Sequence, residues 1–157
     1  GLQVQSFPSF GAERRGAPVS AFLRADAEEI TLRCGILHPD WIVLFEPDLL
    51  ENPMIMKGAD PLTSAVLNVP RIPEGFDRSR FDRVFTVDAS GIAERLRLRT
   101  TSFSIVNTAM VGALACAARL VDMESIGRAI QRLVPVKREA NVRAAEEACQ
   151  QVQEVMR

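Results

Sequence analysis

Residues Val84-Phe-Thr-Val-Asp-Ala-Ser-Gly-Ile-Ala-Glu-Arg-Leu-Arg-Leu (84–98) decide the fold class. Val84–Val87 is a short, uncharged run of apolar and β-branched residues, which is typical of a strand that is buried on both faces. Asp88-Ala89-Ser90 follows, and its polar side chains can cap a helix over Gly91–Leu98. A buried strand that leads directly into a helix is the building unit of an α/β domain with a mostly parallel sheet.

Two further buried strands are predicted upstream. Trp41–Phe45 (WIVLF) and Thr63–Val69 (TSAVLNV) are nearly continuous apolar runs. Between them, Glu46-Pro47-Asp48 predicts a short helix that ends near Asn52, because proline suits the first helical position and carboxylates favour a helix N-terminus. This order of strands and helices predicts a Rossmann-like three-layer α/β sandwich with a mostly parallel sheet.

The N-terminal region has a different pattern, with shorter runs in which apolar residues alternate with polar ones. Leu2–Phe7, Val19–Arg24 and Ile30–Cys34 are predicted strands. Because a short turn at Asp26–Glu29 separates the last two, we expect them to form an antiparallel hairpin.

The second half of the chain is predicted to be helical. Phe103–Ala118 is apolar around nearly its whole circumference, which is typical of a buried helix, and Asn107 is its one strongly polar side chain. We expect Asn107 to be a hydrogen-bonded core amide, in preference to a ligand contact. A second helix, capped by Asp122, and a third, starting near Lys137, complete the prediction. Their apolar stripes are Ile126, Ala129, Ile130 and Leu133, and Ala140, Ala144, Ala148, Val152 and Val155.

Composition limits the possible functions. The chain has 157 residues, the size of one domain, and a net charge of −1, so no overall field attracts it to nucleic acid or to a membrane. Its longest apolar run, Ala109–Ala118, is too short to span a bilayer. Cys34, Cys116 and Cys149 are far apart in the sequence, which predicts reduced thiols in a cytoplasmic protein and no metal site.

The densest group of polar and conformationally special residues is Phe7–Pro18, where Glu13-Arg14-Arg15 lies between Gly11 and Gly16. Two interpretations are open. Glu13 and an arginine could form an ion pair that shapes the loop, or the loop could contact an anion, a cofactor or another chain. A second basic stretch, Arg71–Arg83, is interpreted as a solvated loop in preference to a phosphate or nucleic-acid site, because acidic residues balance its four arginines.

The usual catalytic signatures are missing from the sequence. It has no G-x-G-x-x-G fingerprint, no phosphate-binding loop that ends in Gly-Lys-Ser/Thr and no G-x-S-x-G nucleophile elbow. Its one histidine, His38, is interpreted as a loop residue. Glu46, Asp48 and Glu51 are explained by the helix dipole rather than by acid–base catalysis. We therefore expect no catalytic residues in this chain.

Five stretches together resemble the gamma subunit of pyruvate and related 2-oxoacid:ferredoxin oxidoreductases. The longest is Phe-Pro-Ser-Phe-Gly-Ala-Glu-Arg-Arg-Gly-Ala-Pro-Val-Ser-Ala-Phe-Leu-Arg (7–24). The others are His-Pro-Asp-Trp-Ile-Val-Leu (38–44), Val-Asp-Ala (87–89), Asn-Thr-Ala-Met-Val-Gly-Ala (107–113) and Glu-Ala-Asn-Val-Arg-Ala (139–144). The family normally starts with a strand, a glycine-rich loop and a helix. The resemblance therefore implies that residues 1–157 form a gamma-type domain that lacks this first βα unit.

The resemblance implies a supporting role in a larger enzyme. Family complexes decarboxylate a 2-oxoacid oxidatively, make an acyl-coenzyme A and pass electrons to ferredoxin. Their thiamine diphosphate, Mg and iron–sulfur clusters are held by alpha, beta and delta-type subunits, and the gamma unit packs near the active site. By this resemblance, we expect Glu13, Arg14, Arg15, Gly16, Pro18 and Asn107 to lie at a subunit interface or near coenzyme A.

The Arg-Gly-Ala-Pro form of the loop favours the pyruvate type of gamma subunit. The alternative is a stand-alone Rossmann-like domain that binds a small molecule or nucleotide. A nicotinamide-dependent dehydrogenase is disfavoured by the missing glycine fingerprint. Co-purification distinguishes the gamma subunit from the stand-alone binding domain. A brown complex with larger chains supports the subunit, and a colourless monomer with nucleotide affinity supports the binding domain.

Overall fold

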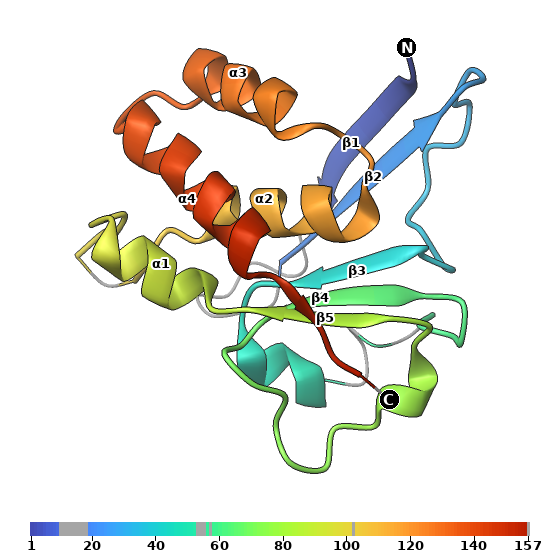
Figure 1. The fold of residues 1–157 in the computed structure, drawn as a ribbon. Coiled ribbons are helices and arrows are strands. Elements are labelled where there is room, and N and C mark those ends of the chain that lie inside the picture. The colour runs from blue at the N-terminus through green and yellow to red at the C-terminus, as the bar shows by residue number, and fades with distance from the viewer. Residues whose placement is uncertain (10–18, 53–55, 57, 102, 157) are drawn as a thin grey trace. The chain divides into compact units, whose positions relative to one another are not determined.

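The computed structural model describes residues 1–9, 19–52, 56, 58–101 and 103–156. The chain divides into two compact units, Gly1–His38 and Pro39–Arg157, which are described separately. The first contains two strands, β1 (Gln3–Ser9) and β2 (Ser20–Asp26), which pair antiparallel. The second contains the sheet and the α-helices (Figure 1).

The hairpin of the first unit is not the predicted one. Residues 30–34 form no strand, and β2 pairs instead with β1, from Gln3↔Asp26 to Ser9↔Ser20. Alternation of apolar and polar residues predicts a strand but carries no information on its partner, so the turn at residues 26–29 was mistaken for a hairpin turn. His38 lies outside helices and strands, as predicted.

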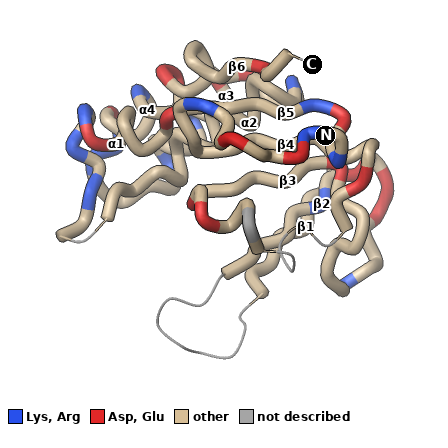
Figure 2. Tube along the Cα trace, turned by 90° about the horizontal axis from the view of Figure 1, so that it is seen from below, with Lys and Arg blue, Asp and Glu red and all other residues tan. Residues whose placement is uncertain are grey.

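The sheet of the second unit has the strand order β3-β4-β5-β6. Its strands are β3 (Trp41–Leu44), β4 (Ser64–Asn68), β5 (Val84–Val87) and β6 (Gln153–Glu154). The first three are parallel and β6 runs antiparallel to β5. The predicted α/β class with a mostly parallel sheet is confirmed. Figure 2 shows β3, β4 and β5 without a charged residue, as expected of strands with two covered faces.

Alternate residues of the strands contribute to two cores. On one face, Val66, Phe85 and Val87 pack against α1 (Ala89–Arg95), α2 (Asn107–Ala118) and α4 (Arg138–Gln151). On the other face, Ala65, Leu67 and Val84 pack against Met56, Phe81 and residues of the 3₁₀ helix η1 (Pro47–Glu51). Figure 1 shows the α-helices of this unit on one side of the sheet and η1 on the other.

Two of the helix starts, those of α1 and α3 (Met123–Leu133), were predicted by their capping residues. The Asp88 carboxylate accepts a 2.8 Å hydrogen bond from the Gly91 backbone N–H at the start of α1. Asp122 accepts one of 2.7 Å from Ser125 at the start of α3, and this bond holds the pKa of Asp122 below its ordinary value.

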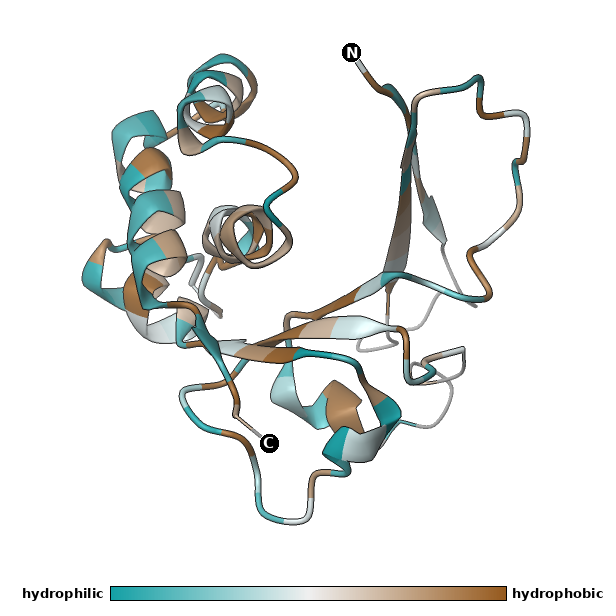
Figure 3. Ribbon diagram, turned by 45° about the vertical axis from the view of Figure 1, so that its right-hand side comes forward, coloured by the Kyte–Doolittle hydropathy of each residue, from teal (hydrophilic) through white to brown (hydrophobic). Residues whose placement is uncertain are grey.

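Figure 3 shows little hydrophilic colour on α2, in contrast to the divided faces of α3 and α4. Of the predicted α3 stripe, Ile130 is buried, Ile126 is half-buried, and Ala129 and Leu133 are exposed.

The C-terminal helix is shorter than predicted. It ends at Gln151, and β6 then joins the sheet through the Val155 N–H, which donates to the Val84 carbonyl at 2.8 Å. Val152 packs against the core on the helix side of the sheet, and Val155 packs against the core on the opposite side. Residues three apart point to opposite faces of a strand, but the same spacing fits one face of a helix. The prediction therefore extended the helix through Val152 and Val155.

Candidate functional site

The predicted loop residues Glu13, Arg14, Arg15, Gly16 and Pro18 lie outside the described residues. The strands on either side of the loop are described. β1 ends at Ser9 and β2 begins at Ser20, and these two residues are paired. The segment therefore connects two antiparallel strands, whereas the ligand-binding loops of α/β folds follow parallel strands.

One face of the β1–β2 hairpin is covered within its own unit. Phe7 and Phe22 are directly paired, with ring centroids 5.4 Å apart. Beside them, the Arg24 guanidinium donates to Gln5 Oε1 at 3.1 Å and to the Cys34 carbonyl at 2.8 Å. These bonds hold the irregular segment after β2 against this face.

The other face of the hairpin is apolar and exposed. Its cross-strand pairs are Val4↔Ala25, Ser6↔Leu23 and Pro8↔Ala21. Val4 is 63% and Leu23 is 62% exposed, and no side chain of this face carries a charge. None of the described residues among 1–9 and 19–38 is buried. An uncharged surface on a unit without a buried core is typical of a region that contacts another surface.

Asn107 is described, and the prediction that it is a buried core amide is wrong, while its placement at an interface or near coenzyme A stays a prediction. It is the first residue of α2 and is exposed, and its Oδ1 accepts a 3.0 Å hydrogen bond from the Thr108 N–H. The buried amide of this region is Asn141 on α4, which is 5% exposed. Asn141 Oδ1 accepts from Thr108 Oγ1 at 2.8 Å, and its Nδ2 donates to the Lys137 carbonyl at 3.0 Å. The sequence feature that could have located this buried amide is a single asparagine in the first turn of an alanine-rich helix.

The carboxyl ends of the parallel strands are the usual place for a ligand site in an α/β sheet. Asn68, the last residue of β4, is buried, and its Nδ2 donates to the Phe45 carbonyl at 2.8 Å and to Ser90 Oγ at 3.0 Å. The Ser90 N–H donates back to Asn68 Oδ1 at 3.2 Å. One amide thus joins the ends of β3 and β4 to the start of α1, and its polar atoms are used in doing so.

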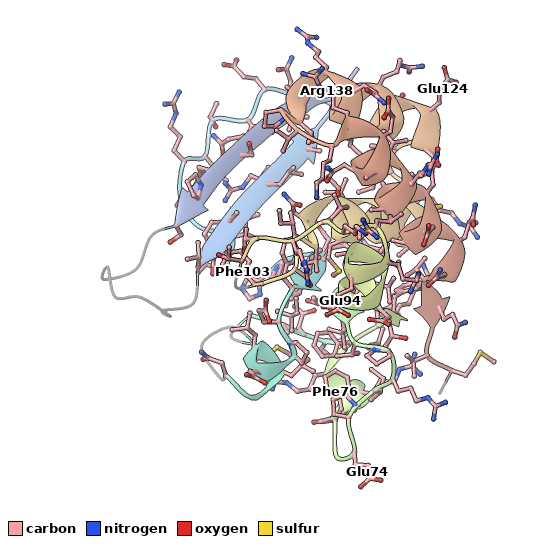
Figure 4. All side chains as sticks on the ribbon, turned by 90° about the vertical axis from the view of Figure 1, so that its left-hand side faces the viewer. Glu74, Phe76, Glu94, Phe103, Glu124 and Arg138 are labelled. Carbon is pink, nitrogen blue, oxygen red and sulfur yellow. A yellow bond between two sulfur atoms is a disulfide. The ribbon has the colours of Figure 1, made fainter. Side chains whose placement is uncertain are left out.

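The basic stretch 71–83 makes internal contacts. Arg83 Nη2 lies 2.8 Å from Glu154 Oε2 on β6, and the guanidinium lies over the Phe85 ring at 4.6 Å. The hydrogen bond from Arg83 lowers the pKa of Glu154 and raises that of Arg83. Arg80 donates to the Met56 carbonyl at 3.3 Å. Figure 4 shows Glu74 at the tip of this loop and Phe76 nearer the sheet. These contacts of Arg80 and Arg83 within the protein favour the interpretation as an ordinary surface loop over a phosphate or nucleic-acid site.

The prediction of reduced thiols is wrong for two of the three cysteines. Cys116 on α2 and Cys149 on α4 form a disulfide with their Cα atoms 5.4 Å apart, and Cys34 is free and exposed. The pair is separated by 33 residues, so its proximity comes from helix packing and not from sequence spacing.

Within the described residues, no three His, Cys, Asp or Glu side chains are grouped to hold a metal ion. The same described part contains no helix long and apolar enough to cross a membrane.

Comparisons with known proteins identify the family. The family model described as pyruvate ferredoxin/flavodoxin oxidoreductase matches residues 1–151. Pyruvate synthase subunit PorC of Methanocaldococcus jannaschii is 41% identical over 149 residues, which cover 94% of this chain and 79% of that protein. The common subunit gamma of the pyruvate/ketoisovalerate oxidoreductases of Thermococcus kodakarensis is 38% identical over 152 residues, covering 94% of this chain and 80% of that protein.

The fold agrees with that of a solved relative. The crystal structure of pyruvate oxidoreductase subunit PORC from Thermotoga maritima superposes with a TM-score of 0.79 at 28% identity, covering 99% of this chain and 83% of that one. The sequence match, the fold match and the family model therefore extend over nearly the same residues. On these grounds the chain belongs to the pyruvate ferredoxin/flavodoxin oxidoreductase family.

Proposed function

We propose that this chain is the gamma subunit of a 2-oxoacid:ferredoxin oxidoreductase complex, of the pyruvate type. The observation that carries the proposal is the 41% identity to a pyruvate synthase subunit along 94% of the chain. The complex decarboxylates the 2-oxoacid on thiamine diphosphate, forms acyl-coenzyme A and passes the electrons to ferredoxin. The alternative of a stand-alone nucleotide-binding domain is not favoured. The side-chain amide of Asn68, at the carboxyl end of β4, is already hydrogen-bonded to Phe45 and Ser90.

In this proposal the chain has a structural role and the cofactors lie on alpha, beta and delta-type partners. The iron–sulfur clusters can be tested against this chain's own residues. A four-cysteine cluster needs four thiolates, whereas the sequence has three cysteines and two of them are bonded to each other. The residues present therefore do not fit such a cluster. A cytoplasmic location is part of the same proposal.

Substrate choice is proposed to belong to the partner chains. The Thermococcus kodakarensis relative is named as a gamma subunit common to pyruvate and ketoisovalerate oxidoreductases. A subunit that serves two substrates does not itself select between them. We therefore expect this chain to support whichever 2-oxoacid its catalytic partners accept.

Reconstitution tests the proposal. The tagged chain is co-expressed anaerobically with alpha, beta and delta-type subunits from the same genome, and the purified complex is assayed for pyruvate- and coenzyme A-dependent reduction of ferredoxin. We expect a brown complex that contains all chains and is active, and no activity from this chain alone. Recovery of the tagged chain without partners, or an active complex assembled in its absence, would refute the proposal.

Arg15 provides a test of the loop. Arg15→Ala is expected to weaken assembly or to raise the coenzyme A concentration needed for half-maximal rate, because an arginine forms strong charge-assisted bonds with carboxylates and phosphates. Arg33→Ala is the matched control, since Arg33 is an exposed arginine of the same unit. Unchanged assembly and unchanged coenzyme A dependence in Arg15→Ala would remove the loop from the proposal and leave the subunit assignment standing.

A further inference from the structure

The disulfide lies between the two helices that pack most closely. Cys116 is in the last turns of α2 and Cys149 is in the last turn of α4, and both residues are half-buried. Cys34, in the other unit, is free and exposed. The chain thus combines one bonded pair with one unpaired thiol that serves as an internal reference.

Packing holds the two cysteines together independently of their bond. Gly112 on α2 faces the backbone of Ala145 on α4 so closely that a Cβ on Gly112 would lie 2.6 Å from the Ala145 Cα. The buried Thr108–Asn141 hydrogen bond joins the same two helices. The small side chains of this contact are all buried: Ala109, Ala113, Ala144 and Ala148. Opening the disulfide therefore leaves the two thiols next to each other, in position to bond again.

One of the two cysteines lies at a surface hollow. Cys116 lines a shallow surface hollow of about 380 Å³ between α2 and α3, together with Arg119, Leu120, Asp122 and others. A thiolate is the reactive form of cysteine in exchange with a disulfide. The hollow is open on its outer side, so a thiol can approach from solvent.

We infer that Cys116 and Cys149 form a reversible thiol–disulfide site that fastens α4 to α2. A small-molecule or protein dithiol supplies the two electrons. Its thiolate attacks Cys116 Sγ, the S–S bond breaks, and Cys149 leaves as a thiolate. The second thiol of the reductant then releases Cys116, so that the reductant becomes a disulfide and the chain gains two thiols after protonation. A disulfide such as oxidised glutathione reverses the exchange.

The state of the bond controls how readily the C-terminal segment detaches. α4 leads directly into β6, and both must leave α2 and β5 together. With the bond closed, α4 stays tethered to α2 at Cys149 even when the packing between the two helices opens. With the bond open, detachment of α4 and β6 becomes a local event, and the amide protection of α4 should fall by on the order of a hundredfold.

Differential alkylation of the full chain tests the bond itself. The chain is equilibrated with mixtures of reduced and oxidised glutathione, the free thiols are blocked, and each cysteine is scored by mass spectrometry. We expect Cys116 and Cys149 to change together in one two-electron step, to recover fully after a reduction–oxidation cycle, and to leave Cys34 alkylated at every mixture that closes the pair. Two independently titrating thiols, or bonding of either one to Cys34, would overturn the inference.

Hydrogen exchange tests the consequence in the same samples, without any substitution. Reduction should speed amide exchange in α4 while β4 and β5 keep their protection and far-UV circular dichroism is unchanged. Cys116→Ser and Cys149→Ser should each reproduce the reduced behaviour under oxidising conditions, and Cys34→Ser should behave as the unmodified chain. Unfolding of the sheet on reduction would show a structural bond instead of a reversible one, and unchanged exchange in α4 would show that the bond fastens nothing.

Discussion

Gly112 shows how a single missing side chain sets the distance between two helices. Its position on α2 allows the Ala145 backbone of α4 to approach closer than any Cβ would permit. Gly112→Ala is therefore expected to destabilise the chain by about 1–3 kcal/mol through overpacking, although alanine is the better helix former. Denaturant unfolding measures the difference.

Gly127 provides the matched control for this prediction. It is also a helical glycine, on α3, but a Cβ there would meet its nearest neighbour, Val142 Cγ1, at an ordinary 3.8 Å. Gly127→Ala is expected to stabilise the chain by up to about 1 kcal/mol, because alanine costs less backbone entropy in a helix. If both substitutions shift stability in the same direction, the close contact of α2 and α4 at Gly112 is wrong.

The buried bond between Thr108 and Asn141 gives a second prediction for single residues. Thr108→Val keeps the shape of the side chain but leaves Asn141 Oδ1 without its 2.8 Å donor in a buried site. We expect a loss of about 1–3 kcal/mol in the free energy of unfolding. Thr101→Val, at an exposed threonine outside helices and strands, should change it by less than about 0.5 kcal/mol. Equal effects of the two substitutions would contradict the role of this bond.

At the scale of the element, β6 is held to the sheet edge by an ion pair as well as by backbone bonds. The side chains of Arg83 and Glu154 are each 41% exposed, so solvent screening limits the contribution of their 2.8 Å contact to at most about 1 kcal/mol. The pair lowers the pKa of Glu154 from its ordinary 4.5. A lowered pKa in the folded state means that the stabilisation is fully present above pH 4.5 and is lost as the pH falls through the folded-state value.

Glu154→Gln tests this pH dependence. We expect the variant to be slightly less stable than the unmodified chain at neutral pH, and the difference should disappear as the pH falls through the lowered pKa that Glu154 has in the folded state. Urea unfolding at a series of pH values measures it. Because the pair is exposed, 1 M NaCl should reduce the neutral-pH difference, and a difference that persists in acid or in salt would contradict the ion-pair explanation.

The elements also show what the sequence could predict. β3, β4 and β5 were found because an uncharged apolar run has few alternatives to a buried strand, and α1 and α3 because Asp88 and Asp122 mark their starts. The partner of β2 and the identity of β6 were missed because pairing depends on residues distant in the sequence. The Cys116–Cys149 bond was missed for the same reason, since 33 residues separate a pair that helix packing brings together. Asn107 was placed in the core because an apolar helix gives no indication of which side faces outward.

At the scale of the whole molecule, this chain has large apolar side chains on its surface in both units. Leu23 is 62%, Phe103 67% and Leu120 60% exposed. Isolated exposed apolar residues are ordinary, but the six uncharged residues that share one face of the β1–β2 hairpin form a continuous patch. We predict that a partner subunit covers this patch in the proposed complex.

The exposed position of Leu23 on this face predicts the effect of Leu23→Glu on assembly. A charge in the middle of the uncharged face should weaken association with the partner subunits at least tenfold, because a buried interface does not tolerate an unpaired carboxylate. The stability of the isolated chain should change little, since Leu23 is exposed there. Leu62→Glu is the matched control, because Leu62 is 84% exposed and lies in a turn of the other unit. Retained affinity in Leu23→Glu, measured by co-purification and by ferredoxin reduction of the reconstituted complex, would mean that the hairpin face remains in solvent and that assembly uses a different surface of the chain.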